Sequence, residues 1–297
     1  MERSFTRTTV MLLVAGLGAS AHAQAQAGDS DLGGPQTLQL TGTVRDFQSN
    51  HPDFQRRPTA GFGHYVYMVA DQLDEEGKPA FGSTGYKLTR DFKDGQGRKI
   101  MAPRDHLPLL DSDQEGSVAS SEGGALTTPE NFSQWFRDVS GVNVSKPVAI
   151  TLVQQPGSGV FTFDDKHDPL YESLGGFFPI NDELYGNYAS HGKNFHFTFE
   201  LDTEFVYREG TGQIFTFKGD DDVWVFIDGK CVIDIGGVHS AITQTIDLDR
   251  LDWLEDGRTY DLKFFFAERH VTQSNFRIET TLNLRSVNLP TTTALYD

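Results

Sequence analysis

The second half of the chain contains ten short strand-like runs, and this feature constrains its fold more than any other. The runs lie between residues 148 and 284 and are separated by clusters of Gly, Asp, Asn and Pro. In NFHFTFEL, Phe195, Phe197 and Phe199 alternate with other residues, which is typical of a strand with one buried face. Strands this numerous, without long helical patterns between them, predict an all-β fold, an antiparallel β-sandwich.

The rest of the chain adds two early strand-like runs and a long polar stretch. LQLTGTVRDF and HYVYMVA begin a single domain that we expect to span residues 38–288. Within it, residues 71–130 are rich in Gly, Asp, Glu, Lys and Ser, with weak periodicity, and predict a loop-rich insertion. TTPENFSQWFRDV predicts a short helix, because Thr128 suits the cap and Pro129 the first helical position. We expect one or two such helices in all.

Both ends of the chain read as segments outside this domain. Residues 1–23 combine early arginines, the apolar run VMLLVAGLG and the small-x-small triplet Ala21-His22-Ala23, as in a signal peptide. Residues 24–37 predict a flexible leader, and residues 289–297 a C-terminal tail. The mature protein is therefore expected to be exported: secreted, at the cell surface, or periplasmic.

Charge and cysteine content limit the partners of the chain. The formal net charge is −17, which argues against nucleic acid and anionic lipid surfaces, since both require a cationic protein surface. No run approaches the roughly 20 apolar residues of a membrane span. Cys231 is the single cysteine, so it cannot pair within the chain, and we expect a buried small hydrophobe or an intermolecular disulfide. Metal cations and neutral glycans remain compatible partners, and the oligomeric state is open.

An acidic run, GDDDVWVFIDG, stands out within the strand-rich half. Asp228-Gly229 between two apolar runs predicts a tight hairpin, which places the aspartates at the opposite end of its first strand. Three adjacent carboxylates repel one another and raise each other's pKa values. The run is either a solvated turn or a Ca²⁺ site, because Ca²⁺ takes six to eight oxygen ligands and removes the repulsion.

Four segments carry a resemblance to a known family. GTVRDFQSNHPDF, NFHFTFELDTEFVY, FTFKGDDDVWVFIDGKCVIDIGGVHS and FFFAERHVTQSNFRIET, taken in order, resemble the fibro-slime domain of secreted bacterial proteins. That domain is related to the protective-antigen-type, jelly-roll-like β-sandwich of microbial adhesins and yeast flocculins. The resemblance extends from Thr41 to Leu284, most of the mature chain, and implies the same all-β fold.

The resemblance also implies a site. In lectins of that superfamily, two successive aspartates joined by a cis peptide chelate Ca²⁺, and sugar hydroxyls complete the coordination. They precede the hairpin Asp by eight and seven residues, which selects Asp220 and Asp221 here. The lectins add an Asn side chain from a later loop, which Asn275 matches. Asp222 occupies a position often held by Gly and is either a further ligand or a contact to sugar.

Three further groups could belong to the same site or to ordinary structure. Glu268, Arg269 and His270 form either an Arg–Glu ion pair at a strand end or hydrogen-bonding partners for a glycan. His239 either caps local backbone or lines the site. The acidic stretch 111–122 has the ligand spacing of a helix–loop–helix Ca²⁺ loop, but no flanking helical pattern, which favours a solvated linker.

These features together predict an exported, Ca²⁺-dependent carbohydrate-binding or adhesion module whose partner is a glycan or matrix polysaccharide. One alternative is a structural extracellular module in which Ca²⁺ only stiffens loops. A second is a polysaccharide-degrading enzyme, although the chain has no Gly-x-Ser-x-Gly, His-Glu-x-x-His or phosphate-binding motif. We expect no enzymatic activity.

Overall fold

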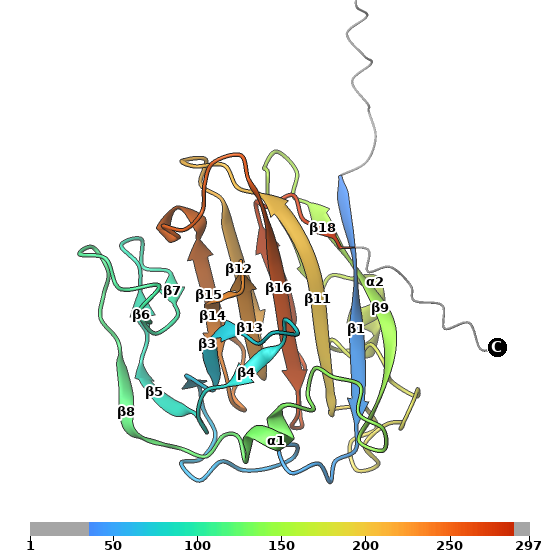
Figure 1. Cartoon of the computed structure of the whole chain (residues 1–297). Coiled ribbons are helices and arrows are strands. Elements are labelled where there is room, and N and C mark those ends of the chain that lie inside the picture. Colours follow the sequence, from blue (N-terminus) through green and yellow to red (C-terminus); the bar gives the residue numbers. More distant parts are fainter. Residues whose placement is uncertain (1–35, 288–297) are drawn as a thin grey trace, which may run out of the picture. The chain divides into compact units, whose positions relative to one another are not determined.

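A curved antiparallel sheet of thirteen strands forms most of the structure, a computed structural model that describes residues 36–287 (Figure 1). The order of its main path is β15-β12-β17-β10-β9-β1-β11-β16-β13-β14-β3-β4, and β18 pairs with β11. The central strands are β1 (Thr37–Phe47), β9 (Asn143–Gln154), β10 (Phe161–Asp164), β11 (Phe197–Val206), β12 (Ile214–Gly219), β13 (Asp222–Ile227), β14 (Lys230–Ile235), β15 (Ile242–Asp247), β16 (Thr259–Glu268), β17 (Phe276–Thr280) and β18 (Arg285–Ser286).

The sheet turns back on itself and encloses an aromatic core. β12 and β16 are separated by five other strands in the sheet order, yet the rings of Phe217 and Phe264 lie 5.5 Å apart. Phe266 of β16 likewise lies 5.1 Å from Phe276 of β17. Each buried Phe contributes about 2–3 kcal/mol through removal of apolar surface from water. The two layers confirm the predicted all-β antiparallel architecture.

The hairpin predicted at Asp228-Gly229 is present between β13 and β14. Asp228 has φ 51° and Gly229 has φ 72°, the left-handed pair that a tight hairpin turn requires. Phe226 pairs with Cys231 beyond a register shift that leaves Val232 of β14 without a partner residue in β13. Cys231 is fully buried, as one of its two expected roles requires, and Trp224 of β13 is buried beside it in the core.

The insertion between residues 71 and 130 is rich in loops, as predicted, and its strands are short. β2 (Tyr65–Val66) precedes the insertion and β3 (Val69–Leu73) leads into it. The strands within it are β4 (Pro79–Phe81), β5 (Tyr86–Arg90), β6 (Phe92–Lys93), β7 (Lys99–Ile100) and β8 (Ser117–Glu122). β2, β5 and β8 form a second sheet, and β6 pairs with β7. The run HYVYMVA was expected to be one strand, but Tyr67 has φ 62° and divides it into β2 and β3.

Helical structure is limited to short segments. The predicted helix is α1 (Pro129–Phe132), and the Thr128 side chain accepts a hydrogen bond from the Asn131 backbone as its cap. Trp135 lies beyond the end of α1 and is buried in the core. The structure adds α2 (Pro169–Leu174) and the 3₁₀ turn η1 (Leu248–Arg250).

The predicted signal peptide (1–23), most of the predicted leader (24–37) and the tail (289–297) lie outside the described residues. Within residues 36–287, no helix has the length and apolar character needed to cross a membrane. β1 begins at Thr37, so the strand takes over the last residue of the predicted leader.

Candidate metal centre

Three connections converge at the end of the sandwich where β16 terminates, which is the lower end in Figure 1. They are the β12–β13 connection with the acidic run, the β14–β15 connection, and the β16–β17 connection from Arg269 to Asn275. Gly219 permits the closest approach, because a Cβ at this position would lie 2.1 Å from the carbonyl oxygen of Asn275. The glycine therefore brings the start of the acidic run against the last of these loops.

Asp220 is bound to Asn275 on both carboxylate oxygens. The Asn275 backbone N–H donates to Oδ1 at 2.6 Å, and its side-chain Nδ2 donates to Oδ2 at 2.7 Å. Rotation of this amide by 180° would present its oxygen instead, because Oδ1 and Nδ2 occupy equivalent positions. The Asp220–Asp221 peptide bond is cis, as expected from the resemblance. The structure therefore brings Asp220 and Asn275 together although they lie 55 positions apart in the chain.

Asp221 faces the same site with few compensating contacts. Its carboxylate accepts only two long hydrogen bonds, both of 3.4 Å, from the backbone N–H groups of His239 and Arg269. Burial raises the pKa of Asp221 well above its usual value, and the neighbouring charge of Asp222 raises it further. Burial also raises the pKa of Asp220. Both carboxylates thus lie in surroundings that disfavour their negative charge unless a cation binds.

Asp222 has a different role from its two neighbours. Its carboxylate accepts hydrogen bonds from Nε of Arg269 at 2.5 Å and from the backbone N–H of Gly237 at 2.6 Å. Arg269 is fully buried, donates further hydrogen bonds to the carbonyl oxygens of Asp53 and Ala125, and packs against a tryptophan ring. Asp222 therefore neutralises a buried guanidinium, which explains the third aspartate of the run and leaves only the first two for a ligand.

Glu268 lies beneath the same site. Its side chain is fully buried, Oε1 accepts a 3.4 Å hydrogen bond from the backbone of His270, and Oε2 has no partner among the described residues. Burial raises the pKa of Glu268 well above its usual value, and the charges of Asp221 and Asp220 add to the effect. Because Arg269 is occupied by Asp222, this group of carboxylates carries more negative charge than the buried cation offsets.

A pocket of about 310 Å³ opens above the two aspartates. The lining residues are Phe62, Asp220, Asp221, Val238, His239, Ser240, His270, Val271, Thr272 and Gln273. The His270 ring lies 4.9 Å from that of Phe62, which is 43% exposed, so this aromatic pair forms one wall. His239 lines the pocket as well. Burial, followed by the charge of His64, lowers the pKa of His239 to about 3, so the His239 ring is neutral.

The structure corrects the expectation that Asp222, Glu268 and Arg269 contact a ligand. All three side chains have no exposed surface and lie under the pocket, where they support the loops rather than line it. The alternative of an Arg269–Glu268 ion pair is also corrected, because the partner of Arg269 is Asp222. Sequence reasoning missed Phe62, which comes from the β1–β2 connection, far from the other pocket residues in the chain and without a motif of its own.

The acidic stretch 111–122 does not form a helix–loop–helix Ca²⁺ loop. Asp113 pairs with Arg250 at 2.6 Å, and Glu122 accepts a hydrogen bond from the backbone of Thr84 at 2.8 Å. Residues 117–122 form β8, where such a loop would continue towards its second helix. Asp113 therefore ties the insertion to Arg250 of η1, and Glu122 binds within the insertion.

The donor set at Asp220 and Asp221 fits a hard divalent cation. It offers the Asp221 carboxylate, which accepts only two 3.4 Å hydrogen bonds, the Asp220 carboxylate and the Asn275 amide, all of which supply oxygen donors of the kind Ca²⁺ prefers. Between residues 36 and 287 there is no cluster of three or more His, Cys, Asp or Glu side chains arranged around one point. A metal here would consequently take only two protein carboxylates and would leave coordination positions for other oxygens.

Comparison with known proteins finds similar proteins in Dictyostelium discoideum. Protein psiH of Dictyostelium discoideum is 38% identical over 265 residues, which cover 84% of this chain and 31% of that protein. Protein psiQ of the same organism is 35% identical over 190 residues, covering 59% and 18%. The chain thus spans less than a third of the length of either relative.

Among solved structures, the PA14 domain of the antifreeze protein MpAFP covers 89% of this chain and 90% of its own, with 11% identity and a TM-score of 0.24. The family model that matches is described as the PA14 domain, and its match runs from residue 156 to residue 292. That segment holds the acidic run, the hairpin and Asn275, so the part of the chain that builds the candidate metal centre is the part that matches the PA14 domain.

Proposed function

We propose that this chain is an exported, Ca²⁺-dependent carbohydrate-binding or adhesion module without catalytic activity. The observation that carries the proposal is the pair Asp220 and Asp221, two nearly buried carboxylates without a cationic partner that line an open pocket. Buried charges in proteins are ordinarily paired or bound to metal, and within residues 36–287 neither carboxylate forms an ion pair, since the nearby Arg269 is paired with Asp222.

The family match supports the carbohydrate part of the proposal. The PA14 domain is a carbohydrate-binding or adhesion-type module that occurs in glycosidases and adhesins. We infer further that the chain represents the fibro-slime variety of this fold. The net charge of −17 supports a glycan rather than nucleic acid as the partner.

In this proposal Asp220, Asp221 and the rotated amide of Asn275 hold the ion. When bound, Ca²⁺ supplies a positive centre to which vicinal sugar hydroxyls coordinate in place of water. Phe62 and His270 offer ring faces to the apolar side of a sugar, and the neutral His239 adds polar contacts. The two carboxylates are adjacent in sequence and both serve the ion, so they do not form the opposed acid pair of a glycosidase.

Calcium binding is tested by isothermal titration of the chelator-stripped protein. We expect stoichiometric binding in the wild type and none in Asp220→Asn/Asp221→Asn. The matched control is Glu75→Gln/Asp105→Asn, which removes two exposed carboxylates outside the pocket and should bind Ca²⁺ as the wild type does. Absence of binding to the wild type, or equal binding to the aspartate variant, would overturn the metal assignment.

Glycan binding is tested on an array with and without chelator. Binding of the protein to a glycan on the array that disappears when chelator is added supports the proposed function. A chelator-induced fall in melting temperature without any retained glycan would instead support a structural module in which Ca²⁺ stiffens loops. Release of reducing sugars from the retained glycans would contradict the absence of catalysis.

A further inference from the structure

A second polar pocket adjoins the metal centre on the other side of Asn275. It has a volume of about 270 Å³, and its lining residues are Asp164, Asp165, Lys166, His167, Lys218, Ala241, Asn275 and Arg277. Asn275 belongs to this pocket and also binds Asp220. Ser240 of the first pocket is followed in the chain by Ala241 of the second. The two depressions are therefore neighbours that share the Asn275 loop as a divider.

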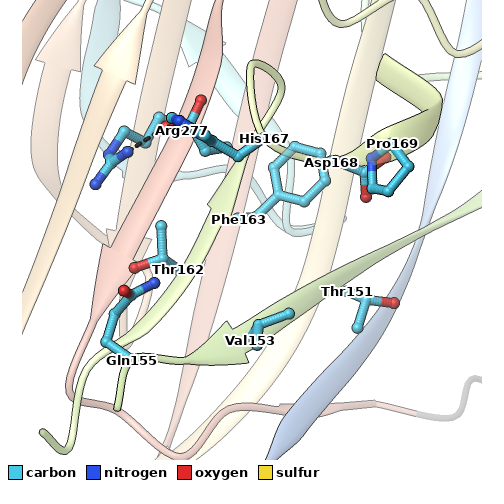
Figure 2. Close-up of a pocket in the computed structure, with 10 residues that line it drawn as sticks. Thr151, Val153, Gln155, Thr162, Phe163, His167, Asp168, Pro169 and Arg277 are labelled. Atoms are coloured by element: carbon cyan, nitrogen blue, oxygen red, sulfur yellow. Dashed lines mark hydrogen bonds and ion pairs between the residues drawn. The ribbon is translucent and has the colours of Figure 1, made fainter. Parts of the chain in front are cut away.

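A third and larger pocket continues the path. Its volume is about 560 Å³, and it shares Asp164, His167 and Arg277 with the second pocket. Figure 2 shows Arg277 and His167 near one another at one end, with Asp168 and Pro169 at the opposite end. Thr151, Val153, Gln155 and Thr162 lie along the lower edge in that view. Hydroxyl, amide and apolar groups alternate there, which suits the mixed polar and apolar surface of sugar rings.

The second pocket contains two free cations in a strongly acidic protein. Lys166 and Lys218 are both exposed, and neither has a carboxylate within ion-pair distance among the described residues. Arg277, in contrast, is paired with Asp164 and Glu279. In a protein with a net charge of −17, two exposed lysines without ion-pair partners form a local source of positive charge in this pocket, beside the buried Asp164 and Asp165.

The fold also keeps these cations next to the proposed ion. Lys218 precedes Asp220 by two residues at the end of β12, and it pairs across the strands with Arg277 of β17. Two cations in directly opposed positions repel each other and weaken the sheet. Lys166 lies close enough to Asp165 and Asp220 for its charge to oppose the effect of burial on both carboxylates. An anionic group between the two lysines would give both of them a partner of opposite charge.

We propose that the groove selects acidic glycans: sugar hydroxyls bind at the Asp220–Asp221 centre, and a carboxylate or sulfate of the same chain binds between Lys166 and Lys218. The third pocket, with Gln155 and Thr162, then receives the next sugar along the polymer. This inference rests on the proposed function, and it adds the ligand class. Carboxylate and sulfate share the chemistry that the lysines recognise, so the experiment contains one arm for each.

The test compares charged polymers with their neutral counterparts. Immobilised protein in CaCl₂ is exposed to oligosaccharides, too short to gel with calcium, of polygalacturonate, alginate, hyaluronate and chondroitin sulfate. Each is paired with its carboxyl-reduced or desulfated form. We expect at least one charged oligomer to bind about tenfold more tightly than its neutral form. Lys166→Gln/Lys218→Gln should remove that preference while the variant still binds Ca²⁺ with the stoichiometry of the wild type.

The matched control is Lys93→Gln/Arg285→Gln, two cations that line none of these three pockets and lower the charge of the protein equally. It should retain the preference of the wild type. Equal affinity for charged and neutral forms, or an unaltered preference in the lysine variant, would overturn the acidic-glycan proposal. So would failure of every charged oligomer to bind. Retention of neutral glycans alone would leave the Ca²⁺-dependent function standing, whereas loss of Ca²⁺ binding would remove both.

Discussion

At the scale of single residues, the buried charge of Arg269 must be neutralised for the loops around the metal centre to be stable. Its guanidinium has no exposed surface, and Asp222 is the carboxylate that binds it. Removal of one partner from a buried pair leaves an uncompensated charge and typically destabilises a protein by about 3–5 kcal/mol. We expect Asp222→Asn to lower the free energy of unfolding by roughly 3 kcal/mol, measured by urea denaturation.

A surface pair provides the comparison for this prediction. Lys99 and Asp91 form an ion pair at 2.7 Å with side chains that are 41% and 34% exposed. Exposed pairs contribute about 0–1 kcal/mol, so Lys99→Gln should change the stability by less than 1 kcal/mol. Equal effects of Asp222→Asn and Lys99→Gln would show that Asp222 does not neutralise a buried charge.

His196 gives the fold a dependence on pH. Burial lowers the pKa of His196 from 6.5 to about 4, followed by the charge of His270. In the unfolded chain the imidazole takes up a proton near pH 6.5, whereas the folded state resists protonation until about pH 4. The stabilisation is therefore complete above pH 6.5 and is lost as the pH falls towards 4, by roughly 2–3 kcal/mol.

The measurement is the free energy of unfolding between pH 4 and 7 for the wild type and His196→Gln, both in chelator. Glutamine keeps a polar group near Gln55, the hydrogen-bond partner of His196. The difference between the two proteins should shrink as the pH falls. Parallel profiles for wild type and His196→Gln would contradict the assignment.

At the scale of elements, the β13–β14 hairpin delivers the acidic run to the site. Gly229 at φ 72° completes its turn, and nothing lies within 4 Å of a Cβ added there, so an alanine would meet only backbone strain. A left-handed residue other than glycine is disfavoured by about 1–2 kcal/mol. We expect Gly229→Ala to destabilise the protein by about 1 kcal/mol in urea denaturation.

Gly159 supplies the control, because a Cβ there also meets nothing within 4 Å and its φ is not in the left-handed region. Gly159→Ala should be neutral or stabilise the protein by up to about 0.5 kcal/mol through the unfolded chain. An equal effect of the two substitutions would exclude the turn conformation as the cause.

Strands and turns with a local signal were predictable from the sequence, and elements that depend on distant contacts were not. The alternation of β11 and the Asp-Gly pair of the hairpin both appear within a few residues of sequence. The break at Tyr67, in contrast, arises because its backbone N–H donates to Asp234, 167 residues away. Pairing with β16 likewise carries β11 unbroken from Phe197 to Val206, beyond the end of the alternating run NFHFTFEL.

The same limit holds for the candidate site at the scale of the whole molecule. Counting back from the hairpin identified Asp220 and Asp221, because turn and run lie in one continuous segment. The role of Asp222 depends on Arg269, 47 residues later, and the wall formed by Phe62 depends on the β1–β2 connection. Burial of Glu268 and Arg269 was equally invisible, since a charged cluster after a strand reads as surface until the loops that cover it are known.

At the scale of the whole molecule, binding of Ca²⁺ at the metal centre should increase the stability of the folded protein. Without Ca²⁺, Asp220 and Asp221 are buried charges that burial itself disfavours. A ligand that binds only the folded state at about 100 times its Kd stabilises it by about 2.7 kcal/mol. For a domain of this size that is a rise in Tm of roughly 5–10 °C. We expect this rise when CaCl₂ replaces chelator in a calorimetric scan of the wild type.

The Tm of Asp220→Asn/Asp221→Asn, in contrast to that of the wild type, should not respond to the replacement of chelator by CaCl₂. Removal of two desolvated charges should keep its Tm in chelator equal to or above that of the wild type, whereas CaCl₂ should leave its Tm unchanged. This pairing separates loss of the ion from loss of the fold, because a misfolded variant would melt lower in both solutions. Glu75→Gln/Asp105→Asn should rise with CaCl₂ as the wild type does, since both carboxylates are exposed and lie outside the pocket. A wild-type Tm that is the same in chelator and CaCl₂ would mean that the carboxylate pair is stabilised without a metal.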